Sequence, residues 1–302
     1  MVSHPRPTGP PRGARPRLLK DAAIGVVGTG QIGGSLVRCL SRLRPDIRVC
    51  AFDLDASLAP KVRPFARVCR TLDDLVLQSD VVVLAVPVQA AVRLLARIAR
   101  LAGRRPSRRR LIVCDTSTVK ATMVTAAARH LAEFDFVGLH PLAGTEGHGW
   151  QAADAALFDG HVVVICCPAG RRAGRAAREL VALVGGIPVS MNPRVHDRLA
   201  AEGIGLPHVL AFAAAGMRTR AAGDHRLKGG SWRSLTRVAA SSPAMVAGFL
   251  HGNRDQQLRV LARFRRHLDA VARALRQPSV GRLERRLAEW QRRMRTTHSG
   301  SR

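Results

Sequence analysis

The sequence of 302 residues contains no tyrosine and very little lysine. Lysine occurs at only four positions and arginine at 45, and the 21 acidic residues leave a net charge of +28. Such an excess raises the question of nucleic-acid binding, because arginine neutralises phosphate. The basic runs, however, have no aromatic residues between them for stacking on bases. A coding bias of a GC-rich genome explains the arginine content more simply.

The sequence also lacks the marks of metal, disulfide and membrane proteins. Its six cysteines show no metal-binding or redox spacing, and several lie in apolar runs, as reduced packing residues of a cytosolic protein do. No stretch approaches the ~18 uncharged apolar residues of a membrane span. Residues 1–20 are basic, contain five prolines and have no apolar signal-peptide core, so we expect a disordered extension there. A hydrophobic content of 46% excludes disorder of the whole chain.

The first two thirds of the chain alternate apolar runs with segments of helical periodicity. The apolar runs lie at 23–27, 49–52, 80–87, 111–115, 136–140 and 162–166. Runs that are apolar on both faces are typical of parallel strands covered by helices on each side. The pattern therefore predicts a doubly wound α/β domain of the Rossmann type over residues 21–192.

Beyond Pro193 the chain changes to long segments rich in Ala, Leu and Arg, and no alternating strand pattern reappears. Helices are expected over 194–222 with an interruption at Pro207, over 243–276 and over 281–295. We therefore predict an all-helical domain over 193–296 and a flexible tail over 297–302.

A glycine-rich turn follows the first expected strand. Gly28, Gly30 and Gly33 form the pattern Gly-x-Gly-x-x-Gly, and Asp53 ends the second strand twenty residues later. In dinucleotide-binding folds the first glycine permits a tight turn, the second lets the pyrophosphate approach, and the third lets the helix pack on the sheet. The helix N-terminus then faces the anion. Because Asp53 would accept from both ribose hydroxyls and repel a 2′-phosphate, the sequence favours NAD over NADP.

Three polar clusters stand where a substrate site is expected. The first cluster is residues 115–120 and the second is residues 140–146, and each follows an expected strand. The third lies in the helical part and consists of His196-Asp197, Leu206-Pro207-His208 and residues 229–237. Ligands of open α/β sheets bind at the carboxyl ends of the strands. We therefore expect these clusters to surround the substrate.

In order and spacing, these motifs resemble the prephenate and arogenate dehydrogenases of tyrosine biosynthesis. The resemblance covers about residues 24–253 and rests on the stretches GTGQIGGSL, DVVVLAVP, DTSTVK, GLHPLAGTEGHG, HD followed by LPH, and GGSWRSLTRVAASSPAM. It implies a Rossmann domain, a helical C-terminal dimerisation domain and a site between them. It places NAD on Gly28, Gly30, Gln31, Ile32, Gly33 and Asp53.

The resemblance also implies roles for individual side chains. His140 matches the family's catalytic histidine, and a neutral imidazole suits the removal of the 4-hydroxyl proton while a hydride leaves the same carbon. Thr118 stands where the family usually has serine, and its hydroxyl could hold the same group. The implied substrate-binding residues are Arg237 for a carboxylate, Arg233 in support, His208 as a contact and Glu146 as an acidic gate of the pocket.

The chain departs from the family pattern at the substrate end. Ile204-Gly205 replaces a common Ser-His, Ser234 replaces a common acidic residue, and Val246 replaces a common Trp. Prephenate, L-arogenate or both are therefore open as substrates, as is feedback by tyrosine. The retained Arg237 and His208 favour prephenate.

Two other functions compete with this interpretation. A β-hydroxyacid dehydrogenase would use a lysine of the helical part as acid or base, and Lys228 is the only lysine after residue 120. An NAD-sensing regulator that binds nucleic acid would bind it with a steep dependence on salt. We favour a cytoplasmic homodimeric dehydrogenase without membrane or nucleic-acid partners. An apolar stripe from Leu258 to Val271 at helical spacing indicates a core or a dimer face.

Overall fold

The computed structural model describes residues 18–299 except 45, 108, 131, 167–170, 218–227 and 278. Residues 1–17 of the extension expected at 1–20 therefore lie outside the described residues. The chain forms two compact units, Met1–Arg254 and Asp255–Arg302, and each is described by itself. The elements expected to form the site all belong to the first unit.

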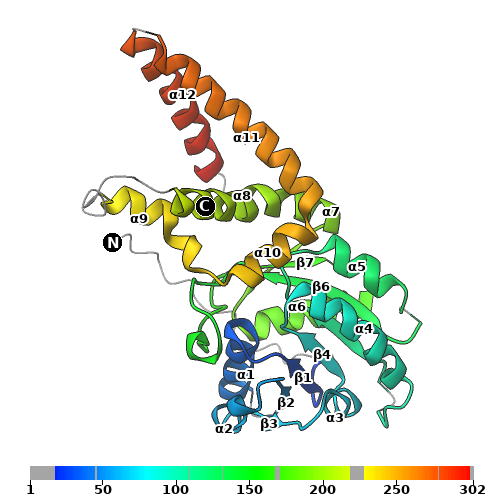
Figure 1. Ribbon diagram of the computed structural model, residues 1–302. Helices are drawn as coiled ribbons and strands as arrows, with labels where there is room; N and C mark the ends of the chain where they lie inside the picture. The colour runs from blue at the N-terminus through cyan, green and yellow to red at the C-terminus, as the bar shows by residue number, and fades with distance from the viewer. Residues whose placement is uncertain are drawn as a thin grey trace. The chain divides into compact units, whose positions relative to one another are not determined.

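The first unit is built on an eight-stranded sheet with the order β3-β2-β1-β4-β5-β6-β7-β8 (Figure 1). The strands are β1 (Ala23–Val27), β2 (Arg48–Phe52), β3 (Arg67–Val68), β4 (Val81–Leu84), β5 (Ile112–Asp115), β6 (Asp135–Pro141), β7 (Val162–Cys166) and β8 (Ile187–Ser190). The strand order reverses between β1 and β4, which is where doubly wound sheets bind their ligands. The predicted Rossmann-type fold class is confirmed.

One strand departs from the parallel arrangement. β7 runs antiparallel to β6, whereas the other neighbours in the sheet are parallel. The connection from β6 to β7 contains only the short 3-10 helix η2 (Trp150–Ala152), whereas parallel neighbours are usually joined through an α-helix. The apolar run at 162–166 predicted the strand and could not show its direction.

Helices cover both faces of the sheet (Figure 1). The elements between the strands are α1 (Gln31–Leu43), η1 (Ala56–Leu58), α2 (Ala59–Val62), α3 (Leu72–Gln78), α4 (Val88–Ala102), α5 (Ala121–Ala128) and α6 (Arg171–Leu183). α1 and α6 pack on one face with Val83, and α3, α4 and α5 pack on the other with Val82 and Leu84. Because successive strand residues enter opposite cores, these strands carry no polar face.

After β8 the first unit is helical. Its elements are α7 (Pro193–Ala200), the π-helical segment η3 (Ala201–Gly205), α8 (Leu206–Gly216), α9 (Gly230–Thr236), the 3-10 helix η5 (Arg237–Ala240) and α10 (Pro243–Gly252). The expected interruption at Pro207 is wrong, because the helix runs on through a π turn that accommodates a residue without an amide donor. Residues 218–222 of the expected helix lie outside the described residues.

The run Pro193–Gly216 is long and apolar enough to cross a membrane by length and composition, with a mean hydropathy of 1.3 over its most apolar window. Its first turns carry His196 and Asp197, which are 3% exposed and are hydrogen-bonded to the α/β part. These buried polar contacts mark the run as a helix of the domain.

The second unit contains most of α11 (Arg254–Leu275), together with α12 (Val280–Ser299). The expected helix over 243–276 is therefore two helices, with Asn253 as the C-cap of α10. On α11 the stripe residues Leu258 and Leu268 are 63% and 52% exposed. α12 continues to Ser299, into the segment expected to be a flexible tail.

Candidate active site

The glycine-rich turn between β1 and α1 leaves room for a phosphate group. Gly28 has a φ of +87°, and a Cβ on Gly33 would lie 1.9 Å from the carbonyl oxygen of Gly28, so neither position accepts a side chain. A Cβ on Gly30 would meet no atom within 4 Å, and the start of α1 has neither a side-chain cap nor an acidic residue in its first turn. Its first amides are thus open to an anion, as the pyrophosphate of a dinucleotide requires.

Asp53 lies directly after β2, beside this turn. Its Oδ2 accepts from the backbone N of Thr29 at 2.6 Å and from its Oγ1 at 2.9 Å, and its Oδ1 accepts from the backbone N of Asp55 at 3.0 Å. A carboxylate offers about four lone-pair sites, and three of them are used here. Two ribose hydroxyls would therefore need the site that the hydroxyl of Thr29 uses. The position agrees with a preference for a free ribose over a 2′-phosphate.

A cavity of about 850 Å³ extends from the glycine-rich turn to the helical part. Of the predicted site residues, its wall contains Gly30, Gln31, Ile32, Thr118, His140, Glu146, His208 and Arg237. Gly28, Gly33, Asp53 and Arg233 lie outside the wall of this cavity. The volume is that of a site for a small organic ligand, and one cavity thus joins the expected cofactor and substrate residues.

His140 lies near the carboxyl end of β6 and is 6% exposed. Burial, the charge of Lys120 and the neighbouring His196 lower the pKa of His140 well below its ordinary value. The imidazole is therefore neutral at pH 7. It can accept a proton from a substrate over the whole neutral range.

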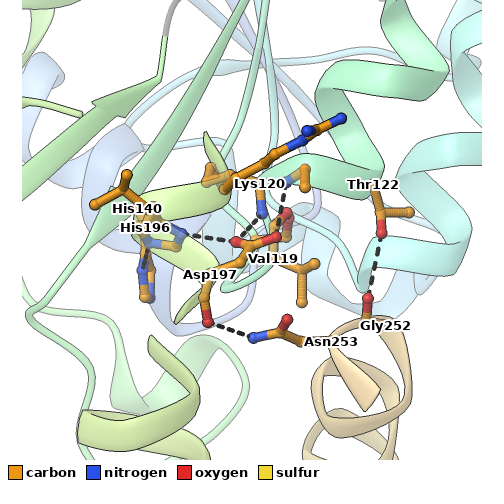
Figure 2. Close-up of polar contacts among 12 residues, drawn as sticks. Val119, Lys120, Thr122, His140, His196, Asp197, Gly252 and Asn253 are labelled. Carbon is orange, nitrogen blue, oxygen red and sulfur yellow. Dashed lines mark hydrogen bonds and ion pairs between the residues drawn. The ribbon is translucent and has the colours of Figure 1, made fainter. Parts of the chain in front are cut away.

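His140 is the end of a buried polar chain (Figure 2). Its Nδ1 lies 2.8 Å from Nε2 of His196, whose Nδ1 lies 2.8 Å from Oδ1 of Asp197. The Asp197 carboxylate also accepts from the backbone N of Lys120 and of Ala121, both at 2.8 Å. Asn253 donates from Nδ2 to the Asp197 carbonyl at 2.7 Å, which ties α10 to α7. Three segments distant in sequence thus meet at Asp197.

A buried ion pair lies next to His140. The side chains of Lys120 and Asp115 are both fully buried, and Nζ of Lys120 donates to Oδ2 of Asp115 and to the carbonyl of Leu139, both at 2.6 Å. Ser117 donates to the same Oδ2 from its backbone N at 3.0 Å and from its Oγ at 2.5 Å. The pair fixes a positive charge behind β6 without exposing it to the cavity.

At the far end of the cavity, Arg237 forms an ion pair with Glu146. Nδ1 of His208 donates to the carbonyl of Ile204 at 2.9 Å, which leaves Nε2 of His208 available. The loop that carries Glu146 is held by Gln31, whose Nε2 donates to Oγ1 of Thr145 at 2.5 Å. The cofactor turn and the substrate loop are therefore linked by a side-chain amide.

Two family models match the chain in series. The nucleotide-binding domain of prephenate dehydrogenase matches residues 38–187, and the prephenate dehydrogenase dimerization domain matches residues 192–289. A cyclohexadienyl dehydrogenase from Zymomonas mobilis is 31% identical over 252 residues, which cover 80% of this chain and 84% of that protein. The chain belongs to the prephenate dehydrogenase family. A prephenate dehydrogenase from Bacillus subtilis is 26% identical, over 84% of this chain and 70% of that protein.

Solved structures of the prephenate dehydrogenase family share the fold. The crystal structure of prephenate dehydrogenase from Aquifex aeolicus has a TM-score of 0.78 at 25% identity, over 90% of this chain and 99% of that one. The predicted family is confirmed, and so is the enzyme class, a dehydrogenase with a nucleotide-binding domain. The alternative of a nucleic-acid-binding regulator is not supported. Lys228 lies over the ring of Trp232 and outside the cavity wall, away from the place of an acid or base.

Within the prephenate dehydrogenase fold, two features of the site had no role in the sequence-based prediction. In the sequence His196 and Asp197 stand as a pair, and Lys120 and Asp115 are the ends of a motif in which the family resemblance implies a function only for Thr118. The signal was present, since a histidine or an acid in an apolar helix or strand must find a partner when it is buried.

Proposed function

We propose that the protein is a prephenate dehydrogenase that uses NAD in the oxidative decarboxylation of prephenate to 4-hydroxyphenylpyruvate. The observation that carries this proposal is the position of His140, a buried neutral imidazole in the wall of one cavity between the open amides of α1 and Arg237. NAD supplies the acceptor for the hydride. Its binding residues would be Gly28, Gly30, Gln31, Ile32, Gly33 and Asp53.

In this proposal His140 accepts the proton of the 4-hydroxyl while the hydride leaves the same carbon. The ring becomes aromatic as carbon dioxide departs, so modest base catalysis suffices. Thr118, in the same wall, would hold the hydroxyl in place. A solved prephenate dehydrogenase of the same fold was crystallised with hydroxyphenyl propionate and NAD+, which supports the choice of a phenolic product and of NAD.

Arg237 would bind a carboxylate of the substrate. Its partner in the structure is Glu146, so an arriving carboxylate must replace the carboxylate of Glu146. This exchange would couple substrate binding to a movement of the loop that carries Glu146. Nε2 of His208 can serve as a second polar contact, and the exposed Arg233 would assist only from outside the cavity wall.

L-Arogenate is the second candidate substrate. Its amino group could form an ion pair with Glu146, which lines the cavity. The chain also has Gly205 at a position where the family commonly has a histidine. A protein of similar fold is an arogenate dehydrogenase from Synechocystis, at 24% identity and a TM-score of 0.73. The retained Arg237 and His208 favour prephenate.

We also propose that the enzyme is a homodimer in the cytoplasm. Its helical part matches a dimerization domain. The described helices of the first unit expose Leu199 and Leu235, each by 50%, and α11 of the second unit exposes Leu258 and Leu268 by 63% and 52%. A second copy of the chain would remove such apolar side chains from water.

The deciding experiment mixes the purified protein with NAD and prephenate, or with NAD and L-arogenate, and follows the absorbance of NADH. Activity with prephenate is expected. The His140→Asn variant should then lose ~10²–10⁴-fold in kcat, while His251→Asn, an exposed histidine of α10, should behave like the natural protein. If neither substrate gives NADH, the proposed function is wrong.

A further inference from the structure

The pair His196 and Asp197 is not used by the proposed function, although it is the polar group nearest to His140. The three side chains form an unbroken line from α7 to β6, with separations of 2.8 Å at both steps. Asp197, His196 and His140 are 3%, 3% and 6% exposed, so water does not compete for these contacts. The cavity wall contains His140 and His196 but not Asp197.

The chemistry of the carboxylate decides where the protons of this line lie. An ionised carboxylate can only accept, and Asp197 already accepts two backbone N–H groups at the start of α5. The nitrogen of His196 that faces it, Nδ1, must therefore carry a proton. In a neutral His196 the other nitrogen, Nε2, then has a lone pair.

That lone pair faces Nδ1 of His140 at 2.8 Å. Two lone pairs would repel each other at this distance, so Nδ1 of His140 must donate. The proton of His140 is thereby held on Nδ1, and its Nε2 is left without one. Nε2 is thus the atom of His140 that can take a proton from a substrate hydroxyl.

We propose that His196 and Asp197 are positioning residues that hold His140 in the Nδ1–H tautomer and stabilise its imidazolium form. The inference rests on the proposed function of His140. When the substrate O–H bond breaks, its proton forms a new N–H bond at Nε2 and its electron pair forms the C=O bond. The C–H bond at the same carbon breaks, and its hydrogen leaves with both electrons to NAD. His140 then carries a positive charge, which the Asp197 carboxylate offsets through His196.

The surroundings of His140 make this support necessary. The charged and titratable groups packed around it are Lys120 with its partner Asp115, and His196 with Asp197, while the cavity wall adds Glu146, His148, His208 and Arg237. Burial, the charge of Lys120 and any charge on His196 disfavour a positive charge on His140, so His196 can support that charge only in its neutral form. The Asp197 carboxylate, linked through His196, supplies the opposing interaction.

The competing arrangement is a doubly protonated His196 that donates from Nε2 to His140. His140 would then carry its proton on Nε2 and could not accept one from a substrate. The two arrangements differ in the position of one proton and have the same heavy-atom distances. A measurement of the histidine tautomers therefore separates them.

The first experiment is a long-range ¹H–¹⁵N spectrum of the full-length protein with ¹⁵N-labelled histidine at pH 7, in which the signals of His140 are assigned from the His140→Asn variant. A protonated Nδ1 and an unprotonated Nε2 are expected for His140. A protonated Nε2 would overturn the proposal. This measurement needs no turnover, so it stands apart from the test of the proposed function.

The second experiment compares His196→Gln with His196→Leu. Glutamine can present its amide oxygen to Nδ1 of His140 and its NH₂ group to Asp197, whereas leucine has a similar size and offers neither. We expect His196→Leu to lower kcat by about 10²-fold or more, with NAD affinity and the KM for prephenate within about twofold, and His196→Gln to keep most of the activity.

Thermal unfolding and NAD titration of both variants distinguish this role from a structural one. Equal losses of kcat in the two folded variants, or full activity of His196→Leu, would contradict the proposal. If His196→Leu does not fold, the tautomer of His140 in the natural protein decides alone. A natural protein with the expected tautomer but no turnover of either substrate would refute the proposed function and leave the proton arrangement in place.

Discussion

Replacing Lys120 by Met should destabilise the folded chain by about 3–5 kcal/mol, the usual cost of leaving one partner of a buried ion pair alone. The magnitude follows from the contacts of its amine. Two unit charges at the observed 2.6 Å attract each other by roughly 6 kcal/mol at an effective dielectric constant of about 20. Part of this is offset, because the variant no longer buries an ammonium group. The carbonyl of Leu139 also loses its donor, which costs about 1–3 kcal/mol.

The same substitution should change the pH dependence of catalysis. The positive charge of Lys120 is one of the causes that lower the pKa of His140. Without it the pKa of His140 rises, so the fraction of unprotonated base begins to fall at a higher pH. The acidic limb of kcat/KM should therefore move to higher pH in Lys120→Met.

Urea unfolding at a fixed protein concentration measures the first effect and initial rates at a series of pH values the second. Lys61→Met is the matched control, since Lys61 is exposed on α2 and its loss should change stability by less than about 0.5 kcal/mol. The double variant Asp115→Asn with Lys120→Met should recover part of the lost stability, because no unpaired charge stays buried. A loss below about 1 kcal/mol in Lys120→Met would refute this account of the pair.

Five further substitutions test the cofactor and substrate ends of the site. Gly33→Ala must displace the backbone at Gly28 and should lower both stability, by about 1–3 kcal/mol, and NAD affinity. Gly30→Ala should lower NAD affinity alone, because its Cβ has free space in the protein; fluorescence titration with NAD and thermal unfolding separate the two, and equal stability losses would contradict the assignment. Asp53→Ser should reduce the preference for NAD over NADP in kcat/KM by about tenfold, or ~1.4 kcal/mol, and an unchanged ratio would remove Asp53 from its role. Arg237→Ala should raise the KM for prephenate by about 10–100-fold, the value of one or two charge-assisted hydrogen bonds, whereas Arg233→Ala, outside the cavity wall, should have a far smaller effect.

The cofactor half of the site could be predicted from the sequence because its determinants are local. A strand, a glycine-rich turn and a helix follow one another within twenty residues, and the turn geometry required at Gly28 and Gly33 leaves glycine as the only residue type that fits. His140 was predicted from its place at a strand end together with the family motif. These inferences need no knowledge of how distant segments meet.

The remaining features depend on contacts between distant segments. His196 and His140 are 56 residues apart, and the Gln31 and Thr145 side chains are 114 apart, so neither contact leaves a local pattern. The direction of β7 is equally hidden, because a strand covered on both faces is apolar whether its neighbour is parallel or antiparallel. The π turn before Pro207 escaped prediction because a proline ordinarily ends a helix.

The scarcity of lysine raises the question of why position 120 has a lysine and not an arginine. The chain uses arginine for almost every cation, yet the fully buried cation behind β6 is a lysine. A Cβ on Gly138 of β6 would lie 2.9 Å from Cδ of Lys120, so the absence of a side chain at position 138 leaves space for the aliphatic part of Lys120. A guanidinium is broader and carries its five donors in a rigid fork, whereas the ammonium donates to Oδ2 of Asp115 and to the carbonyl of Leu139 from one compact group. The charge of this ammonium acts on His140 through the protein interior, where solvent screens it least.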